Sequence, residues 1–306
     1  MKLFQQSIVV QAIVILLALG LLWVDTLTSP GFHWTAIFAM VLILAEGLSL
    51  NIILVNANLC QQNSLLPTLL FTICMSAHAS TLTPMILVTA LWIVCIQVLL
   101  LKGSLLTISV DRACLATALI GLGAMIYLPA ALMMAGYVIV AVTYRLYNWR
   151  DWAVMFLGFA APFVILVLVL MFTNGLADWW QGVLSEAASM RTHTDGCETR
   201  EVVGCTVLSA IMLAGVVKVW NLSGEKPVLW QKNVTMLLAF LVGGCAILAA
   251  TRVFPIDMQL FPIPFTFAVS NLLSPKTGVY TSGRRKRHEW IYVVLLLVVF
   301  AASIIC

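Results

Sequence analysis

The sequence predicts an all-α, polytopic helical membrane protein with about eleven transmembrane segments and a cytoplasmic N-terminus. Of the 306 residues, 62% are hydrophobic and only 9% are charged, whereas a soluble domain carries about 25% charged residues. Apolar stretches recur from end to end, so residues 1–306 are expected to form a single helical transmembrane domain. The predicted spans are 7–24, 34–56, 64–77, 82–101, 113–128, 130–145, 153–173, 202–219, 234–250, 262–273 and 289–305.

The first span, 7–24, follows Lys2 and is interpreted as a retained helix rather than a signal peptide. The residues after it, DTLTSPGF, contain no pattern of small residues typical of a cleavage site. Several later spans fall below the roughly 20 residues that a straight crossing needs. These are expected to be half-helices or re-entrant segments buried by their neighbours. They cover 64–77, 113–128, 130–145 and 262–273.

Span 34–56 contains the most unusual residue of the apolar runs, Glu46. It lies about twelve residues after Trp34, or roughly 18 Å along a helix, which places it near mid-membrane. Ser49 and Asn56 fall on nearby azimuths, so the three residues predict a sparse polar stripe. The favoured interpretation is a buried polar site that hydrogen-bonds to another helix. The alternative is a proton or substrate site of a transporter, although a proton relay normally needs several ionisable residues.

Small residues recur every four positions in span 113–128, at Ala113, Thr117 and Gly121. Such a face lets two helices approach each other closely. The sequence therefore predicts tight helix packing here, and not a nucleotide-binding loop.

The longest polar segment, 174–201, is predicted to be an external, acidic interfacial loop. Residues 176–190 can form an amphipathic helix that lies in the membrane interface, and the alternative is a lid over an external cavity. Cys197 and Cys205 lie in or beside this segment and could form a disulfide in an oxidising periplasm. No spacing of Cys and His typical of a metal or haem site occurs in the sequence, so no cofactor is expected.

The second polar segment, 274–289, is predicted to be a basic cytoplasmic loop. Its four consecutive basic residues are interpreted as a topology determinant, and contact with anionic lipid or an acidic partner is the alternative. They are Arg284, Arg285, Lys286 and Arg287. Nothing in the sequence resembles a nucleic-acid-binding fold.

The distribution of basic residues predicts the orientation. With alternating spans and a cytoplasmic N-terminus, thirteen of the sixteen Lys and Arg residues fall inside, and only Arg191, Arg200 and Arg252 fall outside. This asymmetry follows the positive-inside rule, and the odd number of spans makes the C-terminus external.

Three stretches of the chain form recognisable motifs: LPTLLF (66–71), VDRACLATALIGLGAMIYLPA (110–130) and RLYNWRDW (145–152). They resemble a family of uncharacterised multi-pass inner-membrane proteins of the Bacteroidota, and this resemblance implies a bacterial inner membrane as the location. The similarity covers most of residues 64–165 and implies no catalytic residue. The order of short helices is also similar to that of polytopic glycosyltransferases that use polyprenyl-linked sugars. Asp25, directly after the first span, is the weak catalytic candidate that this second resemblance implies.

These observations favour a non-catalytic inner-membrane protein, a component or scaffold of a membrane complex in cell-envelope biogenesis or secretion. Its expected partners are the lipid bilayer and other inner-membrane proteins. The alternatives are an enzyme or accessory that handles polyprenyl-linked sugars, with Asp25 at its external site, and a transporter that uses Glu46.

Overall fold

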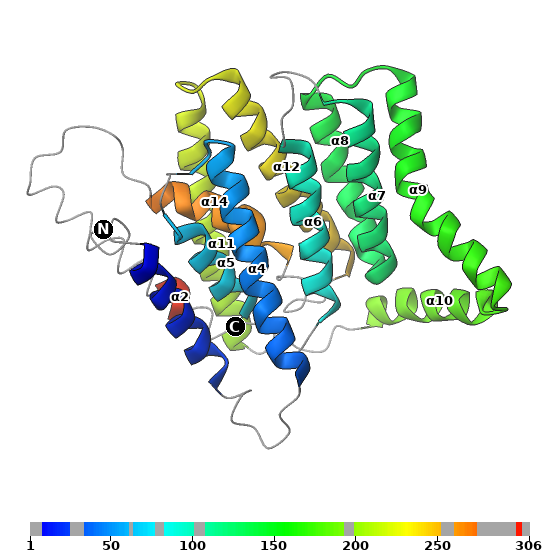
Figure 1. The fold of residues 1–306 in the computed structure, drawn as a ribbon, viewed down its shortest axis with the longest axis horizontal. Coiled ribbons are helices and arrows are strands. Elements are labelled where there is room, and N and C mark those ends of the chain that lie inside the picture. The colour runs from blue at the N-terminus through cyan, green and yellow to red at the C-terminus, as the bar shows by residue number, and fades with distance from the viewer. Residues whose placement is uncertain are drawn as a thin grey trace, which may run out of the picture. The chain divides into compact units, whose positions relative to one another are not determined.

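The computed structural model describes residues 8–24, 34–60, 64–76, 83–100, 108–192, 199–251, 260–273 and 298–301 (Figure 1). These residues form twelve helical elements and contain no strand, so the predicted all-α fold is confirmed for this part of the chain. Four helices are long and apolar enough to cross a membrane, and several shorter helices are also apolar. The chain divides into two compact units, each described by itself. The expected single transmembrane domain stays a prediction.

Unit 1 contains residues Met1–Thr83, Cys197–Lys226 and Pro262–Cys306. Helix α5 packs against α2, α4 and α14, and α14 also packs against α11. Most side chains of α5 and α14 are buried, so these two helices form the core of the unit. The bounds are α2 (Ile8–Leu22), α4 (Trp34–Asn56), α5 (Leu66–Ser76), α11 (Thr199–Ser223) and α14 (Pro262–Leu273).

The two core helices of unit 1 are short, as the sequence predicts. Helix α5 has 11 residues and α14 has 12, so each is about 17 Å long, whereas a bilayer core is about 30 Å thick. Backbone groups at the ends of such helices need partners other than lipid. The side chains that supply these partners are described with the candidate site.

Unit 2 contains residues Pro84–Gly196 and Pro227–Phe261. Helix α7 packs against α6 and α9, while α12 packs against α8 and η1. Pro129 lies in the first turn of the 3₁₀ helix η1, where a backbone N–H has no hydrogen-bond partner within the helix, so the missing N–H of proline costs nothing. The bounds are α6 (Pro84–Leu100), α7 (Val110–Ile126), η1 (Leu128–Leu132), α8 (Met133–Thr143), α9 (Trp149–Phe172), α10 (Leu176–Thr192) and α12 (Val228–Thr251).

The face of small residues on α7 forms the predicted tight contact. Ala113, Thr117 and Gly121 are buried, and a Cβ added to Gly121 would lie 2.5 Å from the carbonyl oxygen of Phe159. Gly158 of α9 faces α7 in the same way, because a Cβ added to Gly158 would lie 2.5 Å from the carbonyl oxygen of Cys114. Each helix thus presents a glycine to the backbone of the other.

Ten of the eleven predicted spans coincide with described helices, and of the last, 289–305, only 298–301 are described. The predicted starts of spans 234–250 and 153–173 are too late, because α12 begins at Val228 and α9 begins at Trp149. Asn148 has extended backbone at the N-cap, and its carbonyl oxygen accepts hydrogen bonds from the N–H groups of Asp151 and Trp152. An acid in the first turn is favourable at a helix N-terminus, so polar residues extend this helix.

A buried hydrogen bond joins α8 and α12 in unit 2. The Tyr144 hydroxyl donates to Oδ1 of Asn233 over 3.0 Å. We expect Tyr144→Phe to lower the free energy of unfolding by about 1 kcal/mol, because the buried amide oxygen loses its donor. Denaturant titration in mild detergent measures this. Tyr147→Phe is the control, because Tyr147 is 67% exposed, and an equal loss in both variants would contradict the expectation.

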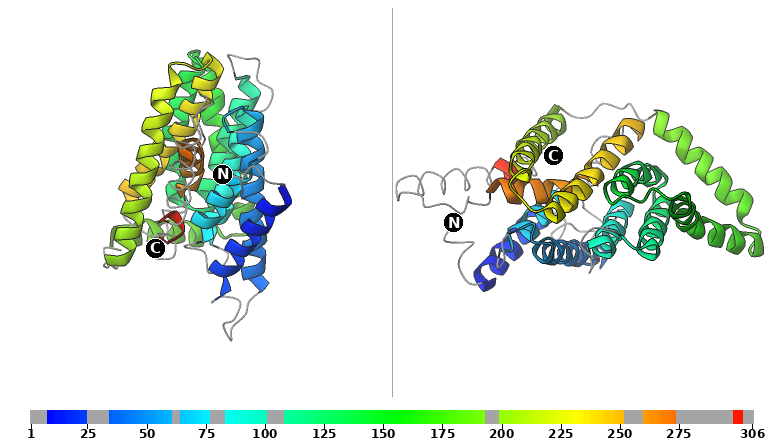
Figure 2. Two further views of the ribbon diagram at one scale, coloured as in Figure 1. Left: turned by 90° about the vertical axis from the view of Figure 1, so that its left-hand side faces the viewer. Right: turned by 90° about the horizontal axis from the view of Figure 1, so that it is seen from above.

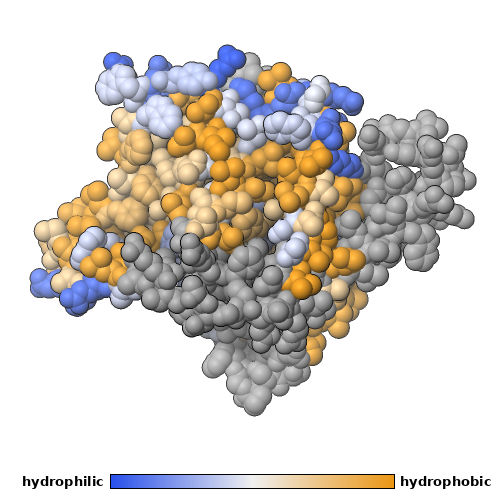
Figure 3. All heavy atoms as spheres, turned by 180° about the vertical axis from the view of Figure 1, so that it is seen from behind, coloured by the Kyte–Doolittle hydropathy of each residue, from blue (hydrophilic) through white to orange (hydrophobic). Residues whose placement is uncertain are grey.

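The outward faces of several helices are apolar. In the membrane-span windows of α9 and of Thr206–Ser223 in α11, only 17% of the residues are buried. Figure 3 shows mainly apolar side chains on the described surface of the face drawn, with hydrophilic ones gathered toward its edges. Faces of this kind are typical of helices in contact with lipid.

Candidate functional site

Glu46 is buried in unit 1, with an exposed fraction of 4%. The buried face of α4 also contains Ile43, Gly47 and Leu50. Ser49 and Asn56 are exposed and do not share this face, contrary to the expected stripe. At 100° per residue they lie roughly 60–80° from Glu46, on the side away from Gly47. Asn51, which the sequence analysis missed, is the second buried polar residue of this helix.

Helix α5 presents a row of polar side chains in the core. Thr68, Thr72 and Ser76 are spaced by four residues and are all buried. The Thr68 hydroxyl donates to the carbonyl oxygen of Gly47 over 3.2 Å, next to Glu46 in the chain. A Cβ added to Gly47 would lie 3.3 Å from the Thr68 carbonyl oxygen, so glycine lets the two helices meet here.

Helix α14 adds a second pair of buried polar residues, Thr266 and Ser270, which are also four residues apart. The Ser270 hydroxyl donates to the Phe267 carbonyl oxygen and lies 3.2 Å from Sγ of Cys60, just after α4. The four-residue spacing in both short helices was visible in the sequence. It was missed because Thr and Ser are common in apolar helices, where they bond to their own backbone.

Two side chains from other helices hydrogen-bond to backbone groups at the ends of the short helices α5 and α14. Oε1 of Gln11, on α2, accepts a hydrogen bond of 2.7 Å from the Leu65 N–H, directly before α5. Nζ of Lys218, on α11, donates to the carbonyl oxygens of Asn271 and Leu272 over 2.9 and 2.8 Å, at the C-terminal end of α14. These contacts supply partners that a helix end lacks. Neither residue was singled out from the sequence, because each partner lies more than 50 positions away.

Besides Nε1 of Trp23, three buried hydroxyl or amide oxygens of unit 1 have no hydrogen-bond partner among the described residues. They are Oδ1 of Asn51, Oγ of Ser76 and Oγ1 of Thr266. A buried polar group without a partner is unfavourable, so such atoms are typical places for water or a ligand. The core of unit 1 is therefore the candidate site, with Glu46 and these three side chains as its polar groups.

Cys60 gives this site a measurable pH dependence. Burial raises the pKa of its thiol from 9.0 to about 11, against a smaller lowering by the Ser270 hydrogen bond. Only the thiolate reacts with alkylating reagents, so we expect the alkylation rate of Cys60 to rise until about pH 11. The unfolded thiol ionises from about pH 9, so the contribution of this group to stability falls as the pH rises between those values.

The measurement is the rate of iodoacetamide modification at Cys60, mapped by mass spectrometry over a range of pH. The urea-unfolded chain is the control and should show a midpoint near 9. A midpoint near 9 in the folded protein as well would contradict the buried environment.

Other predicted site residues lie outside the described residues. These are Asp25, Cys197 and the basic run Arg284, Arg285, Lys286 and Arg287. Cys205 lies within α11, so its pairing with Cys197 stays a prediction. Among the described residues, no group of three or more His, Cys, Asp or Glu residues could hold a metal ion. The predicted helix over 176–190 is present as α10, and its external position stays a prediction.

Comparison with known proteins finds no matching family model, no matching curated protein and no matching solved structure.

Proposed function

We propose that this protein is a non-catalytic, multi-pass component or scaffold of a membrane complex in the cell envelope. The observation that supports this proposal is the hydrogen bonding of buried and part-buried polar side chains in unit 1. Gln11, Thr68 and Lys218 hydrogen-bond to backbone atoms of neighbouring helices. Interhelical polar contacts of this kind hold membrane helices together. Polar groups that tie the chain to itself support a structural role better than a catalytic one.

The proposed topology has about eleven segments, a cytoplasmic N-terminus and an external C-terminus in a bacterial inner membrane. Within each unit, hydrogen bonds join helix ends that this topology places on the same side of the membrane. Gln11 meets Leu65, and Lys218 meets the end of α14, in unit 1. Tyr144 meets Asn233 in unit 2. These pairs support alternation, and the basic residues support its direction.

The proposed membership of the Bacteroidota family rests on the three motif stretches, and their structural setting supports a scaffold. Gly121 lies in the contact of α7 with α9, Pro129 opens η1, and Asn148 is the N-cap of α9. These motif positions thus serve packing and helix ends.

Photocrosslinking in cells tests the scaffold. Benzoylphenylalanine would replace Phe156 on the outward face of α9, 57% exposed, or Trp220 on α11, 68% exposed. The control is Met155, which is 1% exposed. A scaffold should give a discrete adduct with another membrane protein from an outward position and none from Met155. Lipid adducts alone from both outward positions, together with purification in mild detergent without a stoichiometric partner, would contradict the proposal.

A second candidate is a transporter with its site at Glu46. The observation that favours it is the set of polar atoms at Asn51, Ser76 and Thr266 described above. Half-helices inside a membrane protein are typical of transporter sites. If the protein is a proton-coupled transporter, Glu46→Gln should abolish pH-dependent uptake. If it is a scaffold, the same variant should still bind its partner and accumulate in the membrane to the same level as the unchanged protein.

The third candidate, an enzyme or accessory that handles polyprenyl-linked sugars, rests on the resemblance through Asp25. Asp25→Asn should remove sugar transfer in an enzyme and leave a scaffold unchanged. Copurification of a polyprenyl-linked sugar with the protein would favour this candidate.

A further inference from the structure

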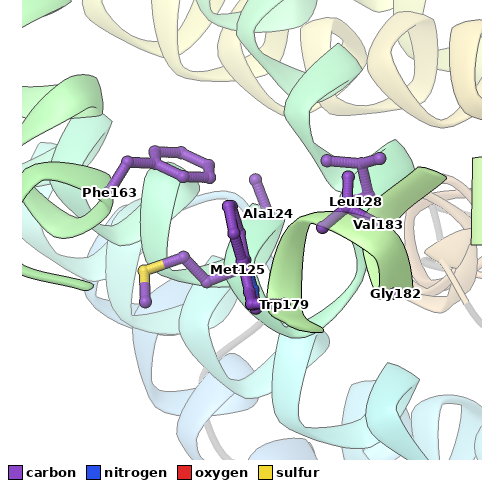
Figure 4. Close-up of a pocket in the computed structure, with 7 residues that line it drawn as sticks. All are labelled: Ala124, Met125, Leu128, Phe163, Trp179, Gly182 and Val183. Atoms are coloured by element: carbon purple, nitrogen blue, oxygen red, sulfur yellow. The ribbon is translucent and has the colours of Figure 1, made fainter. Parts of the chain in front are cut away.

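A pocket of about 290 Å³ opens in unit 2 where α10 meets α7 and α9. Its walls include Ala124, Met125, Leu128, Phe163, Trp179 and Val183, drawn in Figure 4. All of these side chains are apolar except for the indole N–H of Trp179. No charged side chain lines it. The side chains of the pocket can therefore hold an apolar group and carry no charge that would bind an ion.

The packing of α9 explains why the pocket forms. Up to Pro162, α9 lies tightly against α7 through Gly121 and Gly158. Beyond Pro162 its residues are mostly exposed, and Figure 1 and the right-hand view of Figure 2 show it leading away from α7. Helix α10 then returns, so that Trp179 and Val183 come to face the end of α7. The space between the diverging helices is the pocket.

The surroundings of the pocket identify its occupant. The second half of α9 exposes Ile165, Leu168 and Phe172, with exposed fractions of 63, 51 and 88%. Val164 and Met171, with exposed fractions of 55 and 61%, lie between these residues and Phe163 around the helix, so apolar side chains extend from the outer face to the pocket. Helix α10 is amphipathic and carries Asp178 in its first turn, as expected of a helix in the membrane interface. The volume of about 290 Å³ lies just below the roughly 300–1,000 Å³ of ligand pockets, so the pocket fits part of one acyl chain and not a whole lipid.

We propose that this pocket binds one acyl chain of a bilayer phospholipid beneath the interfacial helix α10. The proposal goes beyond the scaffold role and requires only that unit 2 is embedded in a bilayer. The chain enters between the second half of α9 and α10 and displaces water from the apolar walls. Trp179 contacts the chain with its indole ring.

The test uses the full protein in vesicles of phosphatidylethanolamine and phosphatidylglycerol that contain a phosphatidylcholine with a diazirine at the acyl terminus. After illumination, mass spectrometry compares adducts on Met125 and Trp179 with adducts on Leu168 and Phe172 of the outer face. We expect pocket adducts in the unchanged protein. Gly182→Leu should reduce their ratio to outer-face adducts several-fold, because Gly182 lines the pocket and its added Cβ meets no atom within 4 Å.

Gln181→Leu is the control, because it places a leucine side chain on α10 at an exposed neighbour that does not line the pocket. It should leave the ratio unchanged. Val183→Phe provides a second filling variant and should act like Gly182→Leu. The proposal is overturned if pocket residues carry no adducts, if both filling variants leave the ratio unchanged, or if Gln181→Leu lowers it equally.

Discussion

Replacing Gly121 by leucine should lower the free energy of unfolding by about 3 kcal/mol, the upper end of the usual range for overpacking. An added Cβ would lie 2.5 Å from the carbonyl oxygen of Phe159 and 3.3 Å from Cγ of Pro162. The nearest of these atoms belongs to the backbone of α9, so a side-chain rotation cannot relieve the clash. The two helices must separate, and the contact between Gly158 and α7 is lost with them.

The control for this experiment is Gly20→Leu. An added Cβ at Gly20 meets no atom within 4 Å. Since glycine is less favourable than leucine inside a helix by roughly 1 kcal/mol, the control should be neutral or slightly stabilising. Unfolding in a denaturing detergent measures both variants. Equal losses would show that the cost comes from leucine itself and not from the close approach of α7 and α9.

Replacing Lys218 by methionine should cost about 3 kcal/mol of stability, because two carbonyl groups at the end of α14 lose a charged donor. The Nζ atom bonds the Asn271 and Leu272 oxygens over 2.9 and 2.8 Å. Methionine keeps most of the side-chain length, so the loss reports the hydrogen bonds.

Lys226→Met is the matched control for the loss of a positive charge. Lys226 is exposed in the turn after α11, and its substitution should change stability by no more than about 0.5 kcal/mol. Unfolding titrations of both variants in the same detergent give the comparison. A loss at Lys218 no larger than that at Lys226 would contradict its role at the end of α14.

The positions of the helices could be predicted well from the sequence, because apolar length directly limits where a membrane helix can begin and end. Span 34–56 coincides with α4, and the small residues at Ala113, Thr117 and Gly121 predicted a close helix contact, in which α9 is the partner that the sequence did not identify. The helix boundaries were predicted less accurately where polar residues extend a helix. Helix α9 begins at Trp149, after the extended backbone of Asn148, and Asp151 in its first turn is favourable at a helix N-terminus.

The composition of the site could be predicted only in part. Glu46 stood out as a lone charge, but the buried face of α4 turned out to contain Asn51 rather than Ser49. Lipid and protein neighbours are equally apolar, so hydropathy does not show which side of such a helix is buried. The ends of α5 and α14 are completed by Gln11 and Lys218, and such long-range partners leave no local pattern.

The most direct test of the proposed multi-pass topology compares two positions in intact cells. After replacement of the eight native cysteines, single cysteines are placed at Gln181 on α10 and at Gly224, where an added Cβ meets no atom within 4 Å. An impermeant maleimide should label position 181 in intact cells and position 224 only after permeabilisation, because the topology puts α10 outside and the turn between α11 and α12 inside. Labelling of both positions from outside, or of 224 alone, would contradict it.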